Sequence, residues 1–386
     1  LQSLSLQELM AWAPESDWRV GGELAGGGEF TVDAAGAYGG ALQFAISKGT
    51  LAGGVEFGQV LDFDGQLSFD GASAALGAEV NLPGHGRMSA RASGFGRPEG
   101  ELNATLAITD LSFVDGLSAE VQGMRGQLDG ELRAPLADPT QLQGRLEAGG
   151  LAFELPAVGL RASAGQVGLL FEGDGLLRID GGFDIAPGKL RIEGLVGLHD
   201  GDASEIRIRG DNAGLVNLPA VQLAGDSNFA VKRNPAGLVI EGGILLRQGK
   251  IDLDRFSPAV PVSEDVVIED APPPPAPLPV TADISVAMIQ AVDLRGFGIE
   301  ASLNGGVRVT QRPGLPPRGQ GEMLIKGIYN AYGQKLDIER GRLGFGGGRV
   351  DNPSLDILAV KRVDRQRVGV QVRGNAKRPV IRMYSD

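Results

Sequence analysis

The side chains that most often perform catalysis or bind metal ions are scarce in this sequence. The chain of 386 residues contains no Cys and only two His, His85 and His199. Without Cys, thiolate metal sites, disulfides and Cys nucleophiles are excluded. His199 begins the run His199-Asp200-Gly201-Asp202, which could touch a metal ion but is more typical of a solvated turn. We therefore expect a protein that is not an enzyme and that holds no metal ion and no cofactor.

Several glycine-rich segments are similar to known ligand-binding motifs, but each lacks a residue or a spacing that ligand binding requires. Residues 243–250 read GILLRQGK, in which five residues, instead of four, separate the two glycines of a phosphate loop. Ile251 then replaces the Ser or Thr that would hold magnesium. Residues 94–99 lack the third glycine of a dinucleotide fingerprint, and the stretch that begins at residue 62 lacks the Glu that closes a calcium loop. We therefore expect no nucleotide ligand.

The overall composition excludes further classes of protein. Lys and Arg number 36 and Asp and Glu number 48, and the resulting net charge of −12 argues against nucleic acid as a partner. Hydrophobic residues make up 42% of the chain, which is enough to cover one face of extensive structure and argues against disorder. The lack of Cys fits an oxidising compartment such as the bacterial periplasm, but cytosolic chains also lack Cys by chance.

Charge is distributed unevenly along the chain. Residues 335–386 contain 12 Lys or Arg and 6 Asp or Glu, a net charge of +6, whereas the other 334 residues carry −18. One interpretation is a docking surface or a contact with lipid headgroups near the C-terminal end. The other, which is the more common case, is that these cations are solvent-facing residues that protect the edge of a sheet.

Short runs of alternating apolar and polar residues dominate the chain. In EIRIRG, residues 205–210, the alternation places Ile206 and Ile208 on one face of a strand and Arg207 and Arg209 on the other. Many of these runs are separated by Asp-Gly or Asn-Gly pairs, which are typical of hairpin turns. The pairs include Asp64-Gly65, Asp70-Gly71, Asp129-Gly130 and Asn304-Gly305. The pattern predicts an all-β protein, built as a long antiparallel meander.

Two segments depart from the strand pattern. Leu4–Trp12 has helical periodicity and ends before Pro14, so we expect a short N-terminal helix there. Residues 271–279 read APPPPAPLP, and Pro cannot donate a hydrogen bond to a β-ladder. This segment is therefore an exposed loop or linker, which either marks a domain boundary or forms a long insertion within one sheet.

Three elements near the C-terminal end follow the patterns Gly-x-Tyr-x-x-Tyr-Gly, Ile-Glu-x-Gly-x-Leu and Asp-Asn-Pro-x-Leu-Asp. They fall on Gly327, Tyr329, Tyr332 and Gly333; on Ile338, Glu339, Gly341 and Leu343; and on Asp351, Asn352, Pro353, Leu355 and Asp356. With these elements the sequence resembles the C-terminal domain of the TamB family, the translocation and assembly module subunits of the bacterial envelope. The strong similarity covers residues 205–386, which we assign as a TamB-like β-groove domain with a Pro-rich insertion at 263–279. Residues 1–204 share only the loose alternation, and we assign them as AsmA-like β-groove repeats.

The resemblance implies a non-enzymatic periplasmic bridge protein, similar to the AsmA-like proteins that link the inner and outer membranes. In such proteins a sheet curls into an elongated trough, a β-groove or β-taco, whose apolar interior carries phospholipid acyl chains. The resemblance also implies an outer-membrane partner of the TamA type, contacted through a tail beyond residue 386, and an inner-membrane anchor that precedes residue 1. The alternative function is a scaffold that assists the assembly of outer-membrane proteins or autotransporters together with TamA.

A trough is one of two ways to use a sheet with an apolar face, because the face could also pack on a second sheet, as in a sandwich. Two features favour the trough. Aromatic residues make up only 5% of the chain, which predicts a smooth aliphatic lining, and the 61 Gly permit strong coiling. We expect the lipid groove to be lined mainly by Ile206, Ile208, Val307, Val309, Met323, Ile325, Leu336, Ile338, Leu343, Phe345, Val368, Val370 and Val372.

Overall fold

The computed structural model describes most of the chain, namely residues 4–5, 19–32, 38–52, 61–70, 75–95, 97–116, 120–199, 202–256, 279–331, 333–364 and 366–386. The helix expected at Leu4–Trp12 falls mostly outside these residues. Its first two positions form a short strand, β1 (Leu4–Ser5), and its other positions are not described. The Pro-rich segment up to residue 278 also lies outside the described residues.

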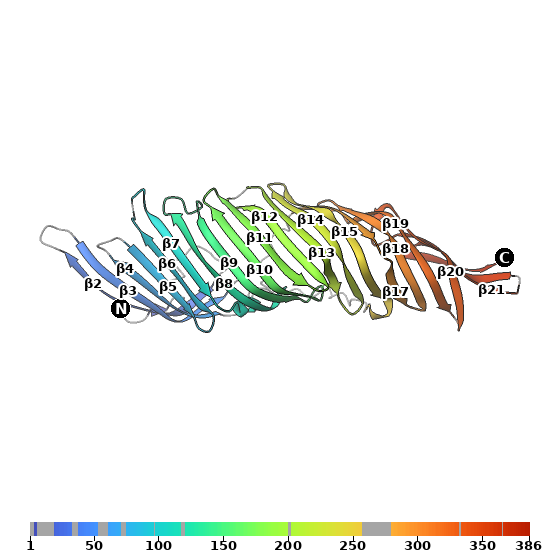
Figure 1. Cartoon of the computed structure of the whole chain (residues 1–386), viewed down its shortest axis with the longest axis horizontal. Helices are drawn as coiled ribbons and strands as arrows, with labels where there is room; N and C mark the ends of the chain where they lie inside the picture. Colours follow the sequence, from blue (N-terminus) through green and yellow to red (C-terminus); the bar gives the residue numbers. More distant parts are fainter. Residues whose placement is uncertain are drawn as a thin grey trace, which may run out of the picture. The chain divides into compact units, whose positions relative to one another are not determined.

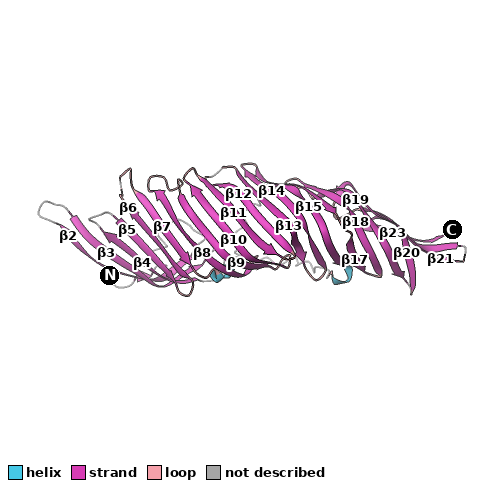
Figure 2. Cartoon of the chain, viewed as in Figure 1, coloured by secondary structure: helices cyan, strands magenta, loops and turns pink. Residues whose placement is uncertain are grey.

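The chain divides into two compact units. The N-terminal unit comprises Leu1–Ile185 and Arg191–Asp202, and the C-terminal unit comprises Ala186–Leu190 and Ala203–Asp386. Nearly all described residues in both units belong to strands (Figure 2). Among these residues, helical structure is confined to two short 3-10 turns, η1 (Ser112–Gly116) and η2 (Leu253–Arg255).

In the N-terminal unit, each strand from β1 to β10 pairs antiparallel with the strand that follows it in sequence (Figure 1). The register keeps the apolar positions of neighbouring strands on the same face, because residues that are directly opposite each other share a face. The strands after β1 are β2 (Arg19–Val32), β3 (Tyr38–Ala52), β4 (Leu61–Asp70), β5 (Ala75–Leu82), β6 (Gly86–Ser93), β7 (Glu101–Ile108), β8 (Gln122–Pro135), β9 (Gln143–Leu155), β10 (Leu160–Glu172), β11 (Leu176–Ile185) and β12 (Gly188–Gly197), the last of which belongs mostly to this unit.

The C-terminal unit continues the same construction with longer strands. Its pairs are antiparallel with two exceptions, which involve β15. The strands are β13 (Ser204–Asn217), β14 (Val221–Asn234), β15 (Gly237–Asp252), β16 (Val280–Met288), β17 (Val292–Gly296), β18 (Ile299–Gln311), β19 (Arg318–Ala331), β20 (Gln334–Arg349), β21 (Ser354–Val363), β22 (Gln366–Asn375) and β23 (Arg378–Ser385).

The two exceptions are parallel pairs, which the predicted meander did not include. Strand β15 pairs in parallel first with β16 and then, further along, with β17. Both of these short strands pair antiparallel with β18 on their other side, so together they form one interrupted strand between β15 and β18. A hairpin cannot join parallel neighbours, whereas a long connection can return the chain to the starting end. Residues 253–279 provide that connection.

The sheet of the C-terminal unit curls, and local irregularities in its register explain how. The pairing of β19 with β20 shifts between Arg318 and Gln320 and again between Leu324 and Ile328, and β20 carries a bulge between Ile338 and Arg340. Each bulge adds a residue to one strand, which bends the strand and increases the local twist. The result is a strongly curved layer instead of a flat sheet (Figure 1).

The most buried apolar residues of this unit lie on one face of that layer. Leu246, Val292, Leu294, Leu303 and Ile325 form a cluster contributed by β15, β17, β18 and β19. Full burial of such a side chain is worth roughly 1.5–3 kcal/mol, so the cluster holds these strands together. All described strands of the unit belong to one sheet, and no second sheet covers this face within the described residues. The predicted all-β trough is confirmed, and the sandwich is not observed.

Candidate functional site

The apolar face of the C-terminal unit brings together side chains from β13 to β18. Ile208 on β13 lies opposite Phe229 on β14, and Phe229 lies opposite Gly242 on β15. Gly242 pairs with Ile284, which in turn pairs with Val309. This ladder runs across five neighbouring strands on one face, because paired residues point to the same side of a sheet. Ile206, two positions earlier on β13, shares the face of Ile208.

The same face continues through β19 and β20. Val307 lies opposite Gly321, which lies opposite Phe345, and Met323 lies opposite Leu343. At the other end of these strands, Leu336 pairs with Tyr329, which itself pairs with Ile299. Ile338 and Leu343 both pack against the buried cluster that contains Ile325. The five strands from β16 to β20 therefore present one unbroken apolar surface.

The last strands extend this surface toward the C-terminal end. Ile338 lies opposite Ala359, Ala359 lies opposite Val370, and Val370 lies opposite Met383 on β23. Val368 and Val372 flank Val370 at spacings of two and so share its face. Val368, however, lies opposite Lys361, which marks the polar end of the apolar surface at this edge.

All thirteen residues predicted to line the groove therefore lie on one face of the C-terminal unit. Val307, Ile325 and Leu336 are buried, and the other ten are half-buried. Half-burial at so many aliphatic positions is what an open, curled face produces, since each side chain is covered by its neighbours but not by a second layer. Contact of these residues with lipid remains a prediction.

The face includes residues that the sequence analysis did not name. Phe229, Ile244, Ile284, Val286 and Val292 lie on it, from strands β14 to β17. A signal was present in residues 280–288, where Ala282, Ile284, Val286 and Met288 alternate with polar or small residues. Strand β17 has only five residues, which is too short for alternation to identify it.

The opposite face of the unit is polar and carries ion pairs between neighbouring strands. Arg308 donates to Asp283, Lys232 lies 3.0 Å from Glu241, and Arg367 lies 3.1 Å from Glu339. The hydrogen bond from Arg308 lowers the pKa of Asp283 below its usual value. These pairs are exposed to solvent, so each contributes little to stability. Their main consequence is that the two faces differ sharply in polarity.

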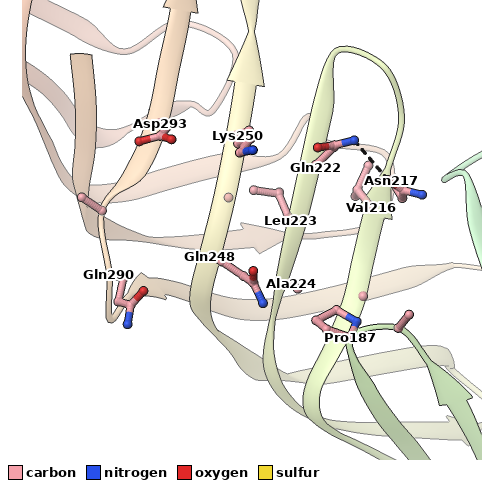
Figure 3. Close-up of a pocket in the computed structure, with 14 residues that line it drawn as sticks. Pro187, Val216, Asn217, Gln222, Leu223, Ala224, Gln248, Lys250, Gln290 and Asp293 are labelled. Carbon is pink, nitrogen blue, oxygen red and sulfur yellow. Dashed lines mark hydrogen bonds between the residues drawn. The ribbon is translucent and has the colours of Figure 1, made fainter. Parts of the chain in front are cut away.

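A cavity of about 420 Å³ opens near the interruption between β16 and β17 (Figure 3). Its polar lining includes Gln222, Lys250 and Asp293, which lie opposite one another on β14, β15 and β17. Gln222 also donates to the side chain of Asn217 at 3.3 Å. The alternating neighbours of these residues face the apolar surface, so this ladder belongs to the polar face. Apolar groups of Pro187, Val216 and Leu223 also line the cavity, so its lining is mixed and differs from the continuous aliphatic face.

Three residues of the N-terminal unit resemble a nucleophile–base–acid relay. The Nε2 of His199 lies 2.9 Å from the Thr140 hydroxyl, and its Nδ1 lies 3.0 Å from Asp202. The Thr140 hydroxyl, however, donates to Asp138, so its proton is held by a carboxylate and not by the imidazole. This cluster joins two turns and lacks the proton arrangement of an activated nucleophile.

Two other near-motifs fold as ordinary strands, whereas the described residues of 94–99 lie between β6 and β7. Residues 243–250, which are similar to a phosphate loop, lie inside β15, and residues 62–65, which are similar to a calcium loop, lie inside β4. In the part of the chain that the structure covers, no three His, Asp or Glu side chains gather as metal ligands would. The described residues also contain no helix long and apolar enough to cross a membrane.

Two glycines that carry the family resemblance, Gly327 and Gly341, lie where neighbouring strands approach each other closely. A Cβ on Gly327 would lie 2.3 Å from the carbonyl oxygen of Glu300, and one on Gly341 would lie 2.4 Å from that of Ile325. Only glycine permits these close approaches between strands. Tyr332 lies outside the described residues.

The Asp-Asn-Pro element joins two turns of the C-terminal unit. Asp351 accepts hydrogen bonds from Arg349 and from the Lys377 ammonium group, the latter at 2.6 Å. These donors lower the pKa of Asp351 far below its usual value. The side chain of Asn352 accepts a hydrogen bond from the backbone N–H of Lys377 at 3.0 Å. The β20–β21 turn is thereby tied to the β22–β23 turn.

Comparisons with known proteins place this architecture in a family. The model of the TamB C-terminal domain matches residues 182–386. The chain is also similar to the translocation and assembly module subunit TamB of Haemophilus influenzae strain Rd, with 25% identity over 318 residues. That alignment covers 74% of this chain and 24% of the relative, so the chain spans about a quarter of the relative's length. The chain belongs to the TamB family and contains its C-terminal domain.

Proposed function

We propose that this chain is a non-enzymatic part of a periplasmic bridge that conducts phospholipid between the inner and outer membranes. The observation that carries the proposal is the continuous apolar face from β13 to β22, over which no second sheet lies within the described residues. An aqueous compartment opposes lipid transfer, since each exposed methylene costs about 0.8 kcal/mol and a sixteen-carbon chain about 13 kcal/mol. An apolar face that covers the acyl chain removes most of that barrier.

The difference in polarity between the two faces suits an amphipathic lipid, whose acyl chains and headgroup need different surroundings. Aliphatic side chains such as Val307, Ile325 and Val370 offer contact to acyl chains but no hydrogen-bonding groups. The charged headgroup would remain at the rim, where water and polar side chains can reach it. No nucleotide is needed for such a pathway, and a TamA-type outer-membrane protein is the partner that membership in the translocation and assembly module favours.

The proposal is tested by placing photo-crosslinking amino acids on the two faces of one strand. Crosslinkers at Val370 and Ile338 should capture phospholipid in cells, because both side chains lie on the apolar face. A matched pair on β18, away from the C-terminal edge, places crosslinkers at Val309 on the apolar face and at the exposed Thr310 on the polar face. Equal labelling at Val309 and Thr310 would contradict the proposal. Phospholipid that co-purifies with the chain, seen by native mass spectrometry, would add support.

A second function, as a scaffold for outer-membrane protein assembly, is favoured by one observation. Within the described residues, β23 pairs with β22 only, so its other edge presents backbone groups that another strand could use. The same crosslinking experiment separates the two functions. Crosslinkers in β23 should capture nascent outer-membrane proteins if the edge is a template for strand pairing, while those at Val370 would then capture no lipid.

A further inference from the structure

Four arginines form a patch on the polar face of the last four strands. We call Arg340, Arg342, Arg373 and Arg382 the basic patch. Arg342 lies opposite Asp356, which lies opposite Arg373. In the adjacent ladder, Arg340 lies opposite Leu358, Leu358 opposite Gln371, and Gln371 opposite Arg382. Two neighbouring ladders therefore bring all four guanidinium groups to one region of the surface.

The acidic partners of the basic patch are too few to neutralise it. Asp356 lies between two arginines, with Arg340 at 3.0 Å and Arg373 at 3.8 Å, and Arg342 pairs with Glu322. Among the described residues, no carboxylate lies within ion-pair distance of Arg382. The same holds for the side chain of Arg378 in the adjacent turn. The surplus of cations agrees with the net charge of +6 in residues 335–386.

The other face of β23 is apolar and exposed. Ile381 is 66% exposed and Met383 is 84% exposed, although their partners on β22, Val372 and Val370, are half-buried. Large apolar side chains with this exposure mark a surface that binds something when they stand together. Strand β23 thus presents exposed apolar side chains on one face and unpaired cations on the other and in its turn.

We propose that the β22–β23 hairpin docks on an anionic lipid surface. Arg382 and Arg378 would contact headgroup phosphates, while Ile381 and Met383 enter the boundary between headgroups and acyl chains. Guanidinium groups suit phosphate because their fork of donors matches its oxygens. This arrangement combines electrostatic attraction with a small buried apolar area, the two contributions that hold interfacial segments on anionic membranes. The proposal goes beyond lipid conduction and stands even if the apolar face carries no lipid.

Charge complementarity distinguishes a membrane from the other occupants of this edge. A second copy of the chain would bring the same surplus of cations to the contact, and like charges would oppose it. A strand of another protein would need backbone pairing and would be indifferent to Arg382, whose side chain points away from the edge hydrogen bonds. A surface of anionic headgroups uses both the cations and the exposed apolar pair.

Vesicle flotation with the complete chain tests the proposal. Vesicles of phosphatidylcholine with about one-third phosphatidylglycerol are compared with vesicles of phosphatidylcholine alone. The chain should float with the anionic vesicles, and raising the salt from about 50 mM to 300 mM should weaken this binding, because salt screens surface charges. Binding that is equal on both vesicles, or unchanged by salt, would overturn the proposal.

Charge-reversal variants locate the contact. The pair Arg378→Glu and Arg382→Glu should reduce binding by at least twenty-fold, since each cation near an anionic surface contributes about fivefold. The matched control reverses Arg233 and Arg312, two exposed arginines of the same unit that lie outside the patch. The control has the same net charge, so an equal loss of binding there would show general attraction and overturn the proposal. Thermal unfolding of Arg378→Gln and Arg382→Gln, which should match that of the parent chain, checks that the fold is intact.

The apolar side is tested separately. Ile381→Ser with Met383→Ser should also weaken flotation while leaving the salt dependence in place. Size-exclusion chromatography of the same variant reports on self-association. A variant that floats like the parent chain but loses a dimer would assign these side chains to an interface between copies and overturn the membrane assignment. Lipid crosslinking at Val309 on β18, which lies away from β23, is read separately, so a negative result in one experiment does not contradict the other proposal.

Discussion

One ladder on the apolar face of each unit shows that the same register rule can bring together side chains of different size. In the N-terminal unit, Ala78, Ala90 and Ala104 lie opposite one another on β5, β6 and β7. A ladder on the apolar face of the C-terminal unit contains Ile208, Phe229, Gly242, Ile284 and Val309. The register therefore determines which face is apolar, while the volume of the side chains determines how much space is left above the sheet.

This difference in side-chain size predicts how strongly the stability of each unit depends on side-chain packing. A buried cluster around Val292, which is 0% exposed, forms in the C-terminal unit because large branched side chains on a curled layer cover one another. The three alanines on β5, β6 and β7 cannot do so, and they leave a roomier stretch of the face between the larger side chains of the neighbouring ladders. We expect the C-terminal unit to respond more strongly to substitutions on its apolar face, and to hold acyl chains more closely.

The largest effect is expected where packing is complete. Val292→Asp places a carboxylate in a site that water does not reach, so the C-terminal unit should lose several kcal/mol of stability and unfold. Ala104→Asp, on the half-buried face of the N-terminal unit, should leave the fold intact because its carboxylate can stay hydrated. Thermal unfolding and limited proteolysis measure both. An equal loss of stability in the two variants would contradict the claim that packing matters more in the C-terminal unit.

The next effect concerns function with the fold preserved. Val370→Asp puts a charge on a half-buried position, which the open face tolerates when it is hydrated. An acyl chain would have to displace that water at a cost of several kcal/mol, and each 1.4 kcal/mol slows passage about tenfold if this step limits the rate. Complementation of a strain that lacks the parent gene should therefore fail while the melting transition is retained.

Matched variants sharpen that result. Val370→Leu keeps the position apolar and should complement normally. Ala90→Asp, on the roomier face of the N-terminal unit, should impair complementation less than Val370→Asp, because an acyl chain has space to avoid the carboxylate. A collapsed melting transition for Val370→Asp would instead assign the residue to a packed core and contradict the open face.

Alternation in the sequence predicted which residues share the apolar face better than it predicted bulges and strand order. Ile206 and Ile208 were correctly placed together, because alternation is a local property of one strand. Ile338 and Leu343 are five positions apart, and strict alternation would put them on opposite faces. The bulge between Ile338 and Arg340 returns both to one face, but such an extra residue has no signature that single-sequence alternation reveals.

Long-range features were beyond the reach of the sequence for a related reason. The parallel entry of β16 beside β15 depends on where residues 253–279 return the chain, and no turn motif encodes that. The ion pair of Arg308 with Asp283 joins residues 25 positions apart and exists only in this register. The sequence showed the excess of cations in residues 335–386 as a net charge. Only the pairing of strands β20 to β23 showed that the arginines of the basic patch lie in two neighbouring ladders.

A smaller effect is expected at glycines that permit close approach of strands. Gly327→Ala in the C-terminal unit would bring its Cβ within 2.3 Å of the Glu300 carbonyl oxygen, a backbone atom that cannot move aside cheaply. We expect a loss of roughly 2–4 kcal/mol. Gly150→Ala in the N-terminal unit meets no atom within 4 Å and is strained only by its φ of +62°, so about 1 kcal/mol is expected. Urea unfolding of both variants measures the difference, and a larger loss for Gly150→Ala would contradict the close-approach argument.

The smallest effects are expected at two carboxylates that stabilise turns, one in each unit. Asp351 is held mainly by hydrogen bonds from the cations Arg349 and Lys377, whereas Asp138 is held mainly by the neutral side chains of Thr140 and Gln141. Both pKa values are lowered in the folded chain. A lowered pKa means that the contribution to stability is present above the unfolded value near 4 and is lost as the pH falls through the folded value.

The two carboxylates should differ in their response to salt. Asp351→Asn should lower stability slightly at pH 7, and the difference from the parent chain should shrink both in strong acid and at high salt, because the cations act partly through charge. Asp138→Asn should show the same dependence on pH but little dependence on salt, since neutral donors are not screened. Urea unfolding at pH 7 and in strong acid below about pH 2, with and without about 0.5 M NaCl, measures all four conditions. A salt-independent Asp351 would mean that its turn is held by geometry alone, and the contrast between charged and neutral turn contacts in the two units would then disappear.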